Sequence, residues 1–168
     1  FNFIMKKSIP CYAHPETARV LRSNFSYIFS DKSHYVGFKP KLTIEEVGTE
    51  PFEVGEMNIL PFDMEHGGIR VMGIRVGDFA YATDCSSIPP KSMETLKGVR
   101  VLIIDALRHR EHPSHLTVKQ ALNIVDQLKP EKTYFTHTNY ELEYHETNRN
   151  LPKGVELAYD GLTLDITI

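Results

Sequence analysis

Short apolar segments separated by turn-forming residues predict several β-strands along the chain. The clearest pair is a hairpin, in which residues 69–76 and 79–83 flank Gly77-Asp78, a dipeptide suited to a tight turn. Residues 101–104 are all apolar, a run typical of an interior strand covered on both faces. Further strands are expected at residues 9–13, 42–47, 52–62, 132–136, 155–158 and 162–168.

A helical periodicity appears between some of these strands. Thr117 and Gln120 form a capping-box pattern, and apolar residues then follow at helical spacing until Pro130. Shorter helices are expected from Pro15 to about Arg22, over residues 92–97 and from Asn139 to about Asn150, with a loop over residues 26–40. This order of elements indicates an α/β fold, with helices packed on a mixed sheet, in a single domain over residues 1–168.

Histidine and aspartate side chains follow successive predicted strands. His66 precedes the first strand of the hairpin and Asp84 follows its second, so strand pairing should bring both to one edge of the sheet. The polar segment 105–115 and His137 follow the next two strands. Imidazole and carboxylate groups are ligands for zinc, manganese and iron. Each residue alone could also have a structural role, such as Asp84 capping the next turn, so a metal site and a set of capping residues both remain open.

Composition and charge exclude several classes of protein. A formal charge of −3 without a basic stripe argues against general nucleic-acid or membrane-surface binding. Two cysteines are too few for a disulfide framework, and Cys85, next to Asp84, is expected to be a packing residue. The chain has no secretory signal or membrane-spanning run, so a cytoplasmic location is expected. It also lacks a glycine-rich phosphate loop, which argues against a simple nucleotide-binding module.

The segments at these strand ends resemble the metallo-β-lactamase superfamily over nearly the whole chain. They are most similar to the bacterial branch that contains phosphoribosyl 1,2-cyclic phosphate phosphodiesterase. The resemblance implies an αββα sandwich, of which this chain would be the central and C-terminal portion. The matching segments are residues 79–84 (FAYATD), 101–108 (VLIIDALR), 112–115 (HPSH), 135–137 (FTH), 151–155 (LPKGV) and 159–161 (YDG).

The resemblance also implies a metal-ligand set. His66 and His137 would each bind a different one of two divalent ions, zinc or manganese, and Asp84 would bridge both ions and so take part in catalysis. A hydroxide held by the two metals would be the nucleophile. The family's other ligand motif, His-x-His-x-Asp-His, does not occur in this chain, which begins at Phe1 without an initiator methionine. We expect that motif immediately upstream, and expect the present chain alone to be inactive.

One position departs from the branch. Relatives commonly have a second histidine three residues after the position of His137, and here Tyr140 stands there. Tyrosine, with an ordinary pKa of about 10, is a weak general acid at neutral pH. Tyr140 is therefore one candidate proton donor, and His145 or His115 could serve in its place.

The remaining polar loop suggests how substrate is bound. Arg108, His112 and His115 are expected to contact a substrate phosphate, although His115 could instead help to begin the following helix. The sequence thus predicts a phosphodiesterase acting on a small nucleotide-like or sugar-phosphate-like molecule. Two alternatives remain: an ester or thioester hydrolase of the same superfamily, and a non-catalytic binding protein on this scaffold. Homodimers are common among soluble enzymes, and the sequence leaves the oligomeric state open.

Overall fold

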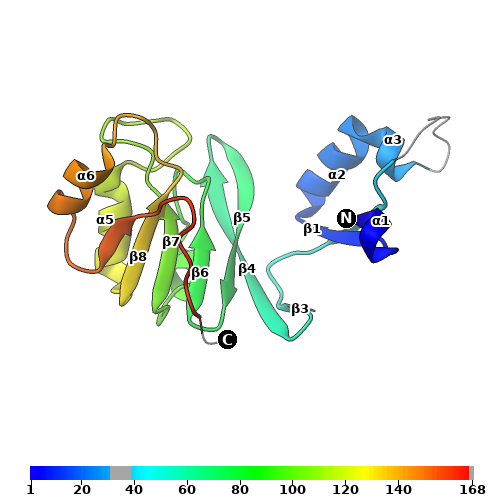
Figure 1. The fold of residues 1–168 in the computed structure, drawn as a ribbon, viewed down its shortest axis with the longest axis horizontal. Helices are drawn as coiled ribbons and strands as arrows, with labels where there is room; N and C mark the ends of the chain where they lie inside the picture. Colours follow the sequence, from blue (N-terminus) through cyan, green and yellow to red (C-terminus); the bar gives the residue numbers. More distant parts are fainter. Residues whose placement is uncertain (31–38, 167–168) are drawn as a thin grey trace. The chain divides into compact units, whose positions relative to one another are not determined.

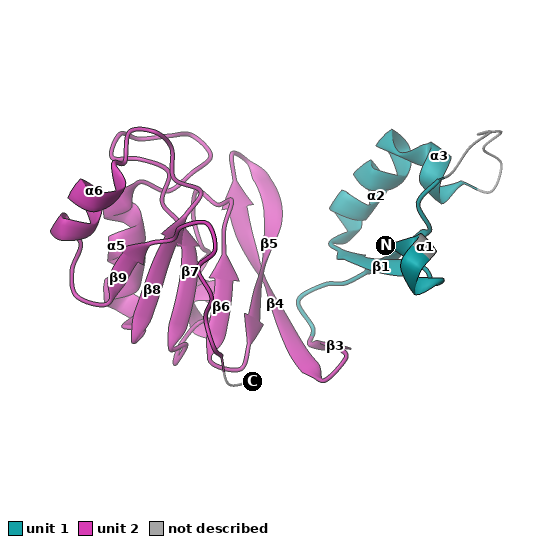
Figure 2. Ribbon diagram, viewed as in Figure 1, with its two compact units in different colours: residues 1–50 teal, residues 51–168 magenta. Residues whose placement is uncertain are grey.

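The computed structural model describes residues 1–30 and 39–166 of the chain. The chain forms two compact units, residues 1–50 and 51–168 (Figure 2), and each is described by itself. The sequence predicts a single domain over residues 1–168, and this remains a prediction. None of the helices in the described part of the chain is long and apolar enough to cross a membrane.

Unit 1 is a small α/β unit with a two-stranded parallel sheet. Its strands pair from Ile9 opposite Leu42 to Ala13 opposite Glu46. Pro15 opens the main helix, and the His14 side chain accepts a hydrogen bond from the Glu16 backbone N–H. The predicted loop over residues 26–40 contains a short helix at its start, and residues 31–38 lie outside the described residues. The elements are α1 (Asn2–Met5), β1 (Ile9–Ala13), α2 (Pro15–Asn24), α3 (Ser26–Phe29) and β2 (Leu42–Glu46).

Unit 2 is built on a seven-stranded mixed sheet with strand order β3-β4-β5-β6-β7-β8-β9 (Figure 1). Strands β3 to β6 pair antiparallel, and β6 to β9 pair parallel. The predicted mixed sheet is confirmed. The strands are β3 (Phe52–Val54), β4 (Met57–His66), β5 (Ile69–Val76), β6 (Phe79–Ala82), β7 (Val101–Asp105), β8 (Lys132–Thr136) and β9 (Val155–Leu157), and the helices are α4 (Pro90–Thr95), α5 (Val118–Leu128) and α6 (Tyr144–Asn150).

The core lies between one face of this sheet and the helices. Alternate residues of β7, Leu102 and Ile104, are fully buried in one cluster with Val118 and Ala121 of α5. Val101 and Ile103 of β7 are half-buried, so this part of β7 is completely covered on one face rather than on both. The capping box predicted at the start of α5 is present.

Three segments differ from their predicted structure. β4 continues to His66 because residues 63–65 stay paired with β5. Helix α6 begins later than expected, because Glu143 caps it while Asn139 instead accepts a hydrogen bond from the Glu141 backbone N–H. The strand predicted at residues 162–168 is not formed within its described part, residues 162–166.

Candidate metal centre

The strands of unit 2 deliver polar side chains to one edge of the sheet. β4 and β6 both pair antiparallel with β5 and so run in the same direction, and β6, β7 and β8 are parallel to one another. The carboxyl ends of these strands therefore share one edge of the sheet. Four polar residues lie there: His66 at the end of β4, Asp84 two residues beyond β6, Asp105 at the end of β7 and His137 just beyond β8.

An isolated β-bridge joins the segment after Asp84 to the end of β4. Glu65 pairs antiparallel with Ser87, and the Glu65 N–H donates to the Ser87 carbonyl at 3.0 Å. His66 and Asp84 consequently have side-chain donor atoms within 4.8 Å of each other. The β5–β6 register alone, if extended, would place Val71 opposite Asp84. The sequence thus predicted the proximity correctly, but a different backbone contact produces it.

Asp84 and His137 face each other in an unusual backbone conformation. Asp84 Oδ1 lies 2.6 Å from His137 Nε2. The φ angles are 59° for Asp84 and 58° for His137, in the left-handed region that non-glycine residues rarely adopt. Each such residue costs on the order of 1 kcal/mol relative to an ordinary conformation. The turns after β6 and β8 therefore keep strained residues whose side chains converge.

His115 lies at the centre of the cluster. Its ring centroid is 4.8 Å from that of His66, 5.0 Å from His112 and 4.5 Å from His137. Its Nδ1 is 3.0 Å from Asp105 Oδ2, and its side chain is only 11% exposed. Two sets of donor atoms fall within 4.8 Å of one another and share this residue: His66, Asp84 and His115, and Asp105, His115 and His137.

Asp105 is the buried carboxylate behind His115. Its Oδ2 accepts hydrogen bonds from the backbone N–H groups of Cys85 at 3.2 Å and Leu116 at 3.4 Å. Its Oδ1 is buried and has no hydrogen-bond partner among the described residues. Burial raises the pKa of the Asp105 carboxyl, against the opposing effect of its hydrogen bond with His115. Asp105 thus joins the segments that follow β6 and β7 and fixes the His115 ring.

Cys85 directly follows Asp84 and is fully buried. Burial, followed by the charges of Asp105 and Asp84, raises the pKa of the Cys85 thiol from 9.0 to about 12. The thiol therefore stays protonated at neutral pH, whereas a metal ligand must be a thiolate. In this structure Cys85 is a packing residue.

The orientation of His66 is set by the loop that carries His115. His66 Nδ1 donates to the Ser114 carbonyl oxygen at 2.8 Å, which leaves the Nε2 lone pair available for a metal. Gly67 permits this contact, because a Cβ at that position would lie 2.9 Å from the Ser114 Cβ. The β4–β5 turn and the His115 loop therefore pack directly on each other.

The predicted substrate-binding residues do not all reach the cluster. His112 adjoins it, and its Nδ1 accepts a hydrogen bond from the Ser114 backbone N–H at 3.3 Å. Desolvation, followed by the nearby Arg108 charge, lowers the pKa of His112. The Arg108 guanidinium instead donates to the carbonyl oxygens of Arg110 and Glu111, at 3.2 and 2.9 Å, and so braces its own loop.

Two of the candidate proton donors lie apart from the cluster. The Tyr140 side chain is 92% exposed. His145 lies in α6, where its ring packs edge-on against Tyr144 with centroids 5.3 Å apart. Within the described part of the chain, His145 belongs to neither of the two donor groups that meet at His115.

Sequence reasoning did not assign Asp105 a role at the site. The sequence nevertheless indicated this residue, because Asp105 ends an apolar strand just as Asp84 follows one. The role of the Ser114 carbonyl could not be predicted in this way, because every residue has a backbone carbonyl and the residue type does not indicate which one accepts a hydrogen bond.

Known proteins resemble this chain in sequence and in fold. The family described as "Beta-lactamase superfamily domain" matches residues 3–138. A solved structure described as a new diphosphatase from the PhnP family is 40% identical, with a TM-score of 0.85, and the match covers 96% of this chain and 60% of that one. The metallo-β-lactamase fold protein YhfI from Bacillus subtilis is 15% identical with a TM-score of 0.72, over 96% of this chain and 66% of that one, a likeness of fold alone.

A curated protein is related over a shorter part of its length. The octanoyltransferase of Porphyromonas gingivalis (strain ATCC BAA-308 / W83) is 31% identical over 159 residues. The match covers 93% of this chain but 32% of that protein. The chain thus spans about a third of this relative and 60% of the diphosphatase.

Proposed function

Because the chain belongs to the metallo-β-lactamase superfamily of hydrolases, we propose that it acts as a metal-dependent phosphodiesterase on a small phosphate ester. The superfamily assigned from the sequence segments is confirmed, as is the fold class. One observation carries the proposal: Asp84 Oδ1 lies 2.6 Å from His137 Nε2, and Asp84 and His66 have donor atoms within 4.8 Å of each other, at the carboxyl ends of the strands. The 40% identical diphosphatase favours a phosphate-containing substrate over a carboxylic ester.

The donor chemistry of the cluster fits divalent metal ions. It combines imidazole nitrogens with carboxylate oxygens, the mixture that zinc and manganese accept. Asp105 Oδ1, buried without a partner among the described residues, is a further oxygen donor that the fold itself does not use. We propose that His66, Asp84 and His137 would hold two such ions through imidazole nitrogens and a carboxylate.

When bound, divalent ions supply Lewis acidity and make water a stronger nucleophile at neutral pH. The chain's own residues prepare the site for this chemistry. The Ser114 carbonyl fixes the proton of His66 on Nδ1, so that Nε2 faces the cluster. The left-handed backbone conformations of Asp84 and His137 hold the two side chains close together in the absence of a ligand.

Cleavage of a phosphodiester leaves an alkoxide that needs a proton. We assign its delivery to His115 rather than to Tyr140 or His145. His115 Nδ1–H donates to Asp105, which leaves Nε2 as the nitrogen that would carry the transferred proton. We propose that His112, beside His115, contacts the substrate phosphate, while Arg108 positions the loop that carries both histidines.

The first test uses the full-length protein, because the present chain alone is expected to be inactive, and measures hydrolysis after loading with Mn²⁺ or Zn²⁺. We expect turnover of bis(p-nitrophenyl) phosphate to exceed that of p-nitrophenyl acetate, and to disappear on chelation and return with added metal. Bound metal is quantified in parallel by elemental analysis. Ester turnover that exceeds phosphodiester turnover would reject the substrate class, and fewer than one ion per chain would reject the metal centre.

Matched variants then test the assigned residues. Asp84→Asn should remove metal and activity together, whereas Asp126→Asn, on the far end of α5, serves as the charge-matched control. His115→Asn should lower kcat by a factor of about 10² to 10⁴ for a leaving group of high pKa, with little effect for p-nitrophenolate, which needs no proton. His145→Asn should leave both rates unchanged. Equal losses in the two histidine variants would refute the assignment of the proton donor.

A further inference from the structure

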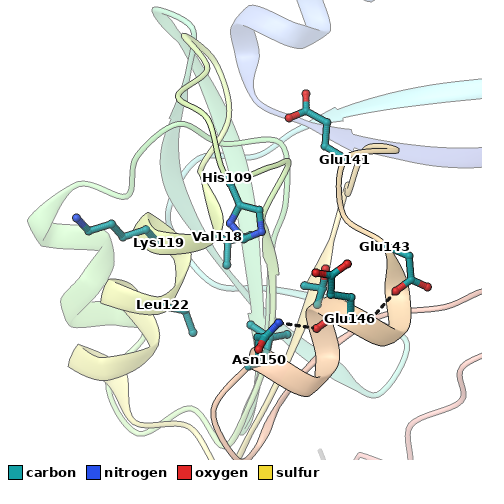
Figure 3. A pocket seen from close by; sticks show the side chains of 10 residues that line it. His109, Val118, Lys119, Leu122, Glu141, Glu143, Glu146 and Asn150 are labelled. Carbon is teal, nitrogen blue, oxygen red and sulfur yellow. Dashed lines mark hydrogen bonds between the residues drawn. The ribbon is translucent and has the colours of Figure 1, made fainter.

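A cavity separate from the metal cluster lies between α5 and α6. Its volume is about 420 Å³, in the range of small-molecule sites (Figure 3). Helix α5 contributes residues such as Val118 and Leu122, and α6 contributes Glu146 and Thr147. None of the side chains in the two metal-binding groups lines it.

The floor of the cavity is aliphatic. Val118 is buried in the core, and Leu122 and Leu151 pack against that core while still lining the cavity. These side chains offer an apolar surface to a ligand without any change in their packing. The cavity thus suits a ligand with a hydrocarbon body.

Its polar side has more negative than positive charge. Glu143 and Glu146 lie on one side, facing His109 across the cavity, and the Lys119 ammonium extends away from them (Figure 3). The pKa of the Glu143 carboxyl is lowered, chiefly because it accepts the Glu146 backbone N–H, so it remains ionised. Neither carboxylate forms a salt bridge with any cation in the described ranges, 1–30 and 39–166.

A third glutamate, Glu141, has a different status. It accepts two hydrogen bonds from the Arg110 guanidinium, at 3.1 and 2.6 Å, and is neutralised by it. The pair at Glu143 and Glu146 therefore supplies the unbalanced charge of the cavity. A ligand carrying a cation would meet attraction there, and an anion would meet repulsion.

Thr147 adds a hydroxyl to the polar side of the cavity. Its side chain is 7% exposed and lines the cavity, yet its hydroxyl has no hydrogen-bond partner within the described chain. The buried side-chain atoms without a partner in the described chain are Asp105 Oδ1 and Thr133 Oγ1, so the Thr147 hydroxyl is accessible from the cavity. The hydroxyl is therefore available to hold the polar head of a bound molecule.

We propose that this cavity binds a small amphipathic cation, a protonated amine on a short hydrocarbon body. The ammonium lies between Glu143 and Glu146 within reach of the Thr147 hydroxyl, and the hydrocarbon rests on Val118, Leu122 and Leu151. An ammonium group presents three donors and no acceptor, which matches two carboxylates and a hydroxyl. The site is distinct from the metal cluster and does not depend on the reaction assigned to it.

The test compares three probes of the same length: hexylamine, hexanol and hexanoate. Binding to the full chain is followed at neutral pH by NMR shift changes of α5 and α6 backbone amides. Hexylamine should saturate with Kd on the order of 1 mM, and hexanol should bind about tenfold more weakly, because it lacks the charge-assisted hydrogen bonds. Hexanoate should not bind. Equal binding of all three, or no saturation by hexylamine, would overturn the proposal.

Variants locate the binding site. Glu146→Gln should weaken hexylamine about tenfold and leave hexanol unchanged, whereas Glu53→Gln, an equal charge change on β3, should alter neither. Thr147→Val should weaken hexylamine by a factor of about three without loss of thermal stability, because the hydroxyl has no partner in the fold. Leu122→Trp, which fills the floor of the cavity, should abolish the binding of both hexylamine and hexanol. If Glu146→Gln binds hexylamine as the parent does, the ammonium position is wrong, whatever the outcome of the hydrolysis assays.

Discussion

Alanine substitution at Gly67 tests how the His115 loop controls the metal cluster. Gly67 and Gly68 form the two-residue turn between β4 and β5, both with positive φ, at 57° and 89°. Such a turn favours glycine at both positions, so alanine at either should cost about 1 kcal/mol of folding stability. The two sites differ in their surroundings: a Cβ at Gly67 lies 2.9 Å from the Ser114 Cβ, and a Cβ at Gly68 meets nothing within 4 Å.

The size of the effect follows from that contact. Carbon atoms pack at about 3.5–4.0 Å, so Ser114 would have to move by roughly 0.6–1 Å. Ser114 holds His66 through the 2.8 Å bond from Nδ1 to its carbonyl oxygen. A shift of that size along the bond lengthens it to about 3.4 Å or more, outside the usual range of about 2.7–3.2 Å, and so weakens it. Loss of such a partner typically lowers metal affinity by a factor of about 10–100.

The assay measures metal affinity by competition with a chromogenic chelator and stability by urea unfolding. We expect Gly67→Ala and Gly68→Ala to lose similar stability, but only Gly67→Ala to lose metal affinity. Imidazole ¹⁵N shifts report the same change without metal, because His66 should lose its fixed Nδ1–H tautomer in Gly67→Ala alone. If both variants bind metal as the parent does, or lose affinity equally, the Ser114 contact does not orient His66.

Two further predictions concern the core. Cys85 should resist an aromatic disulfide reagent in the native protein while Cys11 reacts, and rapid labelling of both thiols would contradict this. The free energy of unfolding should also fall above about pH 9, because the unfolded thiol ionises there and the native one only near 12. Gly73→Ala should lower the free energy of unfolding by about 1–3 kcal/mol, because its Cβ would lie 2.3 Å from the buried Phe62 ring. The control is Gly48→Ala, whose Cβ would meet nothing within 4 Å and which should be neutral in the same urea unfolding assay.

Much of the fold was predictable because its signals are local. The hairpin around Gly77, the capping box at Thr117 and the apolar run at residues 101–104 all produce the elements expected from them. The end of β4 was not predictable in the same way. Residues 63–66 look like a break in the pattern, and only their pairing with β5 keeps them extended. Pairing with β5 decides the structure of residues 63–66, and the local sequence does not indicate that pairing.

The site was predictable to the extent that sheet direction alone decides it. Strands that run in parallel bring their carboxyl ends together, which places Asp84 and His137 at one edge without further information. The central position of His115 depends on its long loop folding back onto Asp105 and His66, which no periodicity encodes. Loop geometry also decides that Tyr140 is exposed to solvent.

The cluster lowers the stability of the fold that carries it. Asp84 and His137 adopt left-handed conformations, and Asp105 keeps one buried oxygen without a partner among the described residues. A fold selected for stability alone would favour glycine at both turns and an apolar residue at the end of β7. These costs are located where the side chains converge, and they are not needed to close the sheet. The other left-handed residues of the described chain, Lys6 and Lys129, end helices, whereas Asp84 and His137 carry the converging side chains. Strain of this kind is expected where a site is retained for its chemistry, and Asp84 and His137 are two of the residues proposed to hold metal, while Asp105 positions the histidine proposed to move a proton.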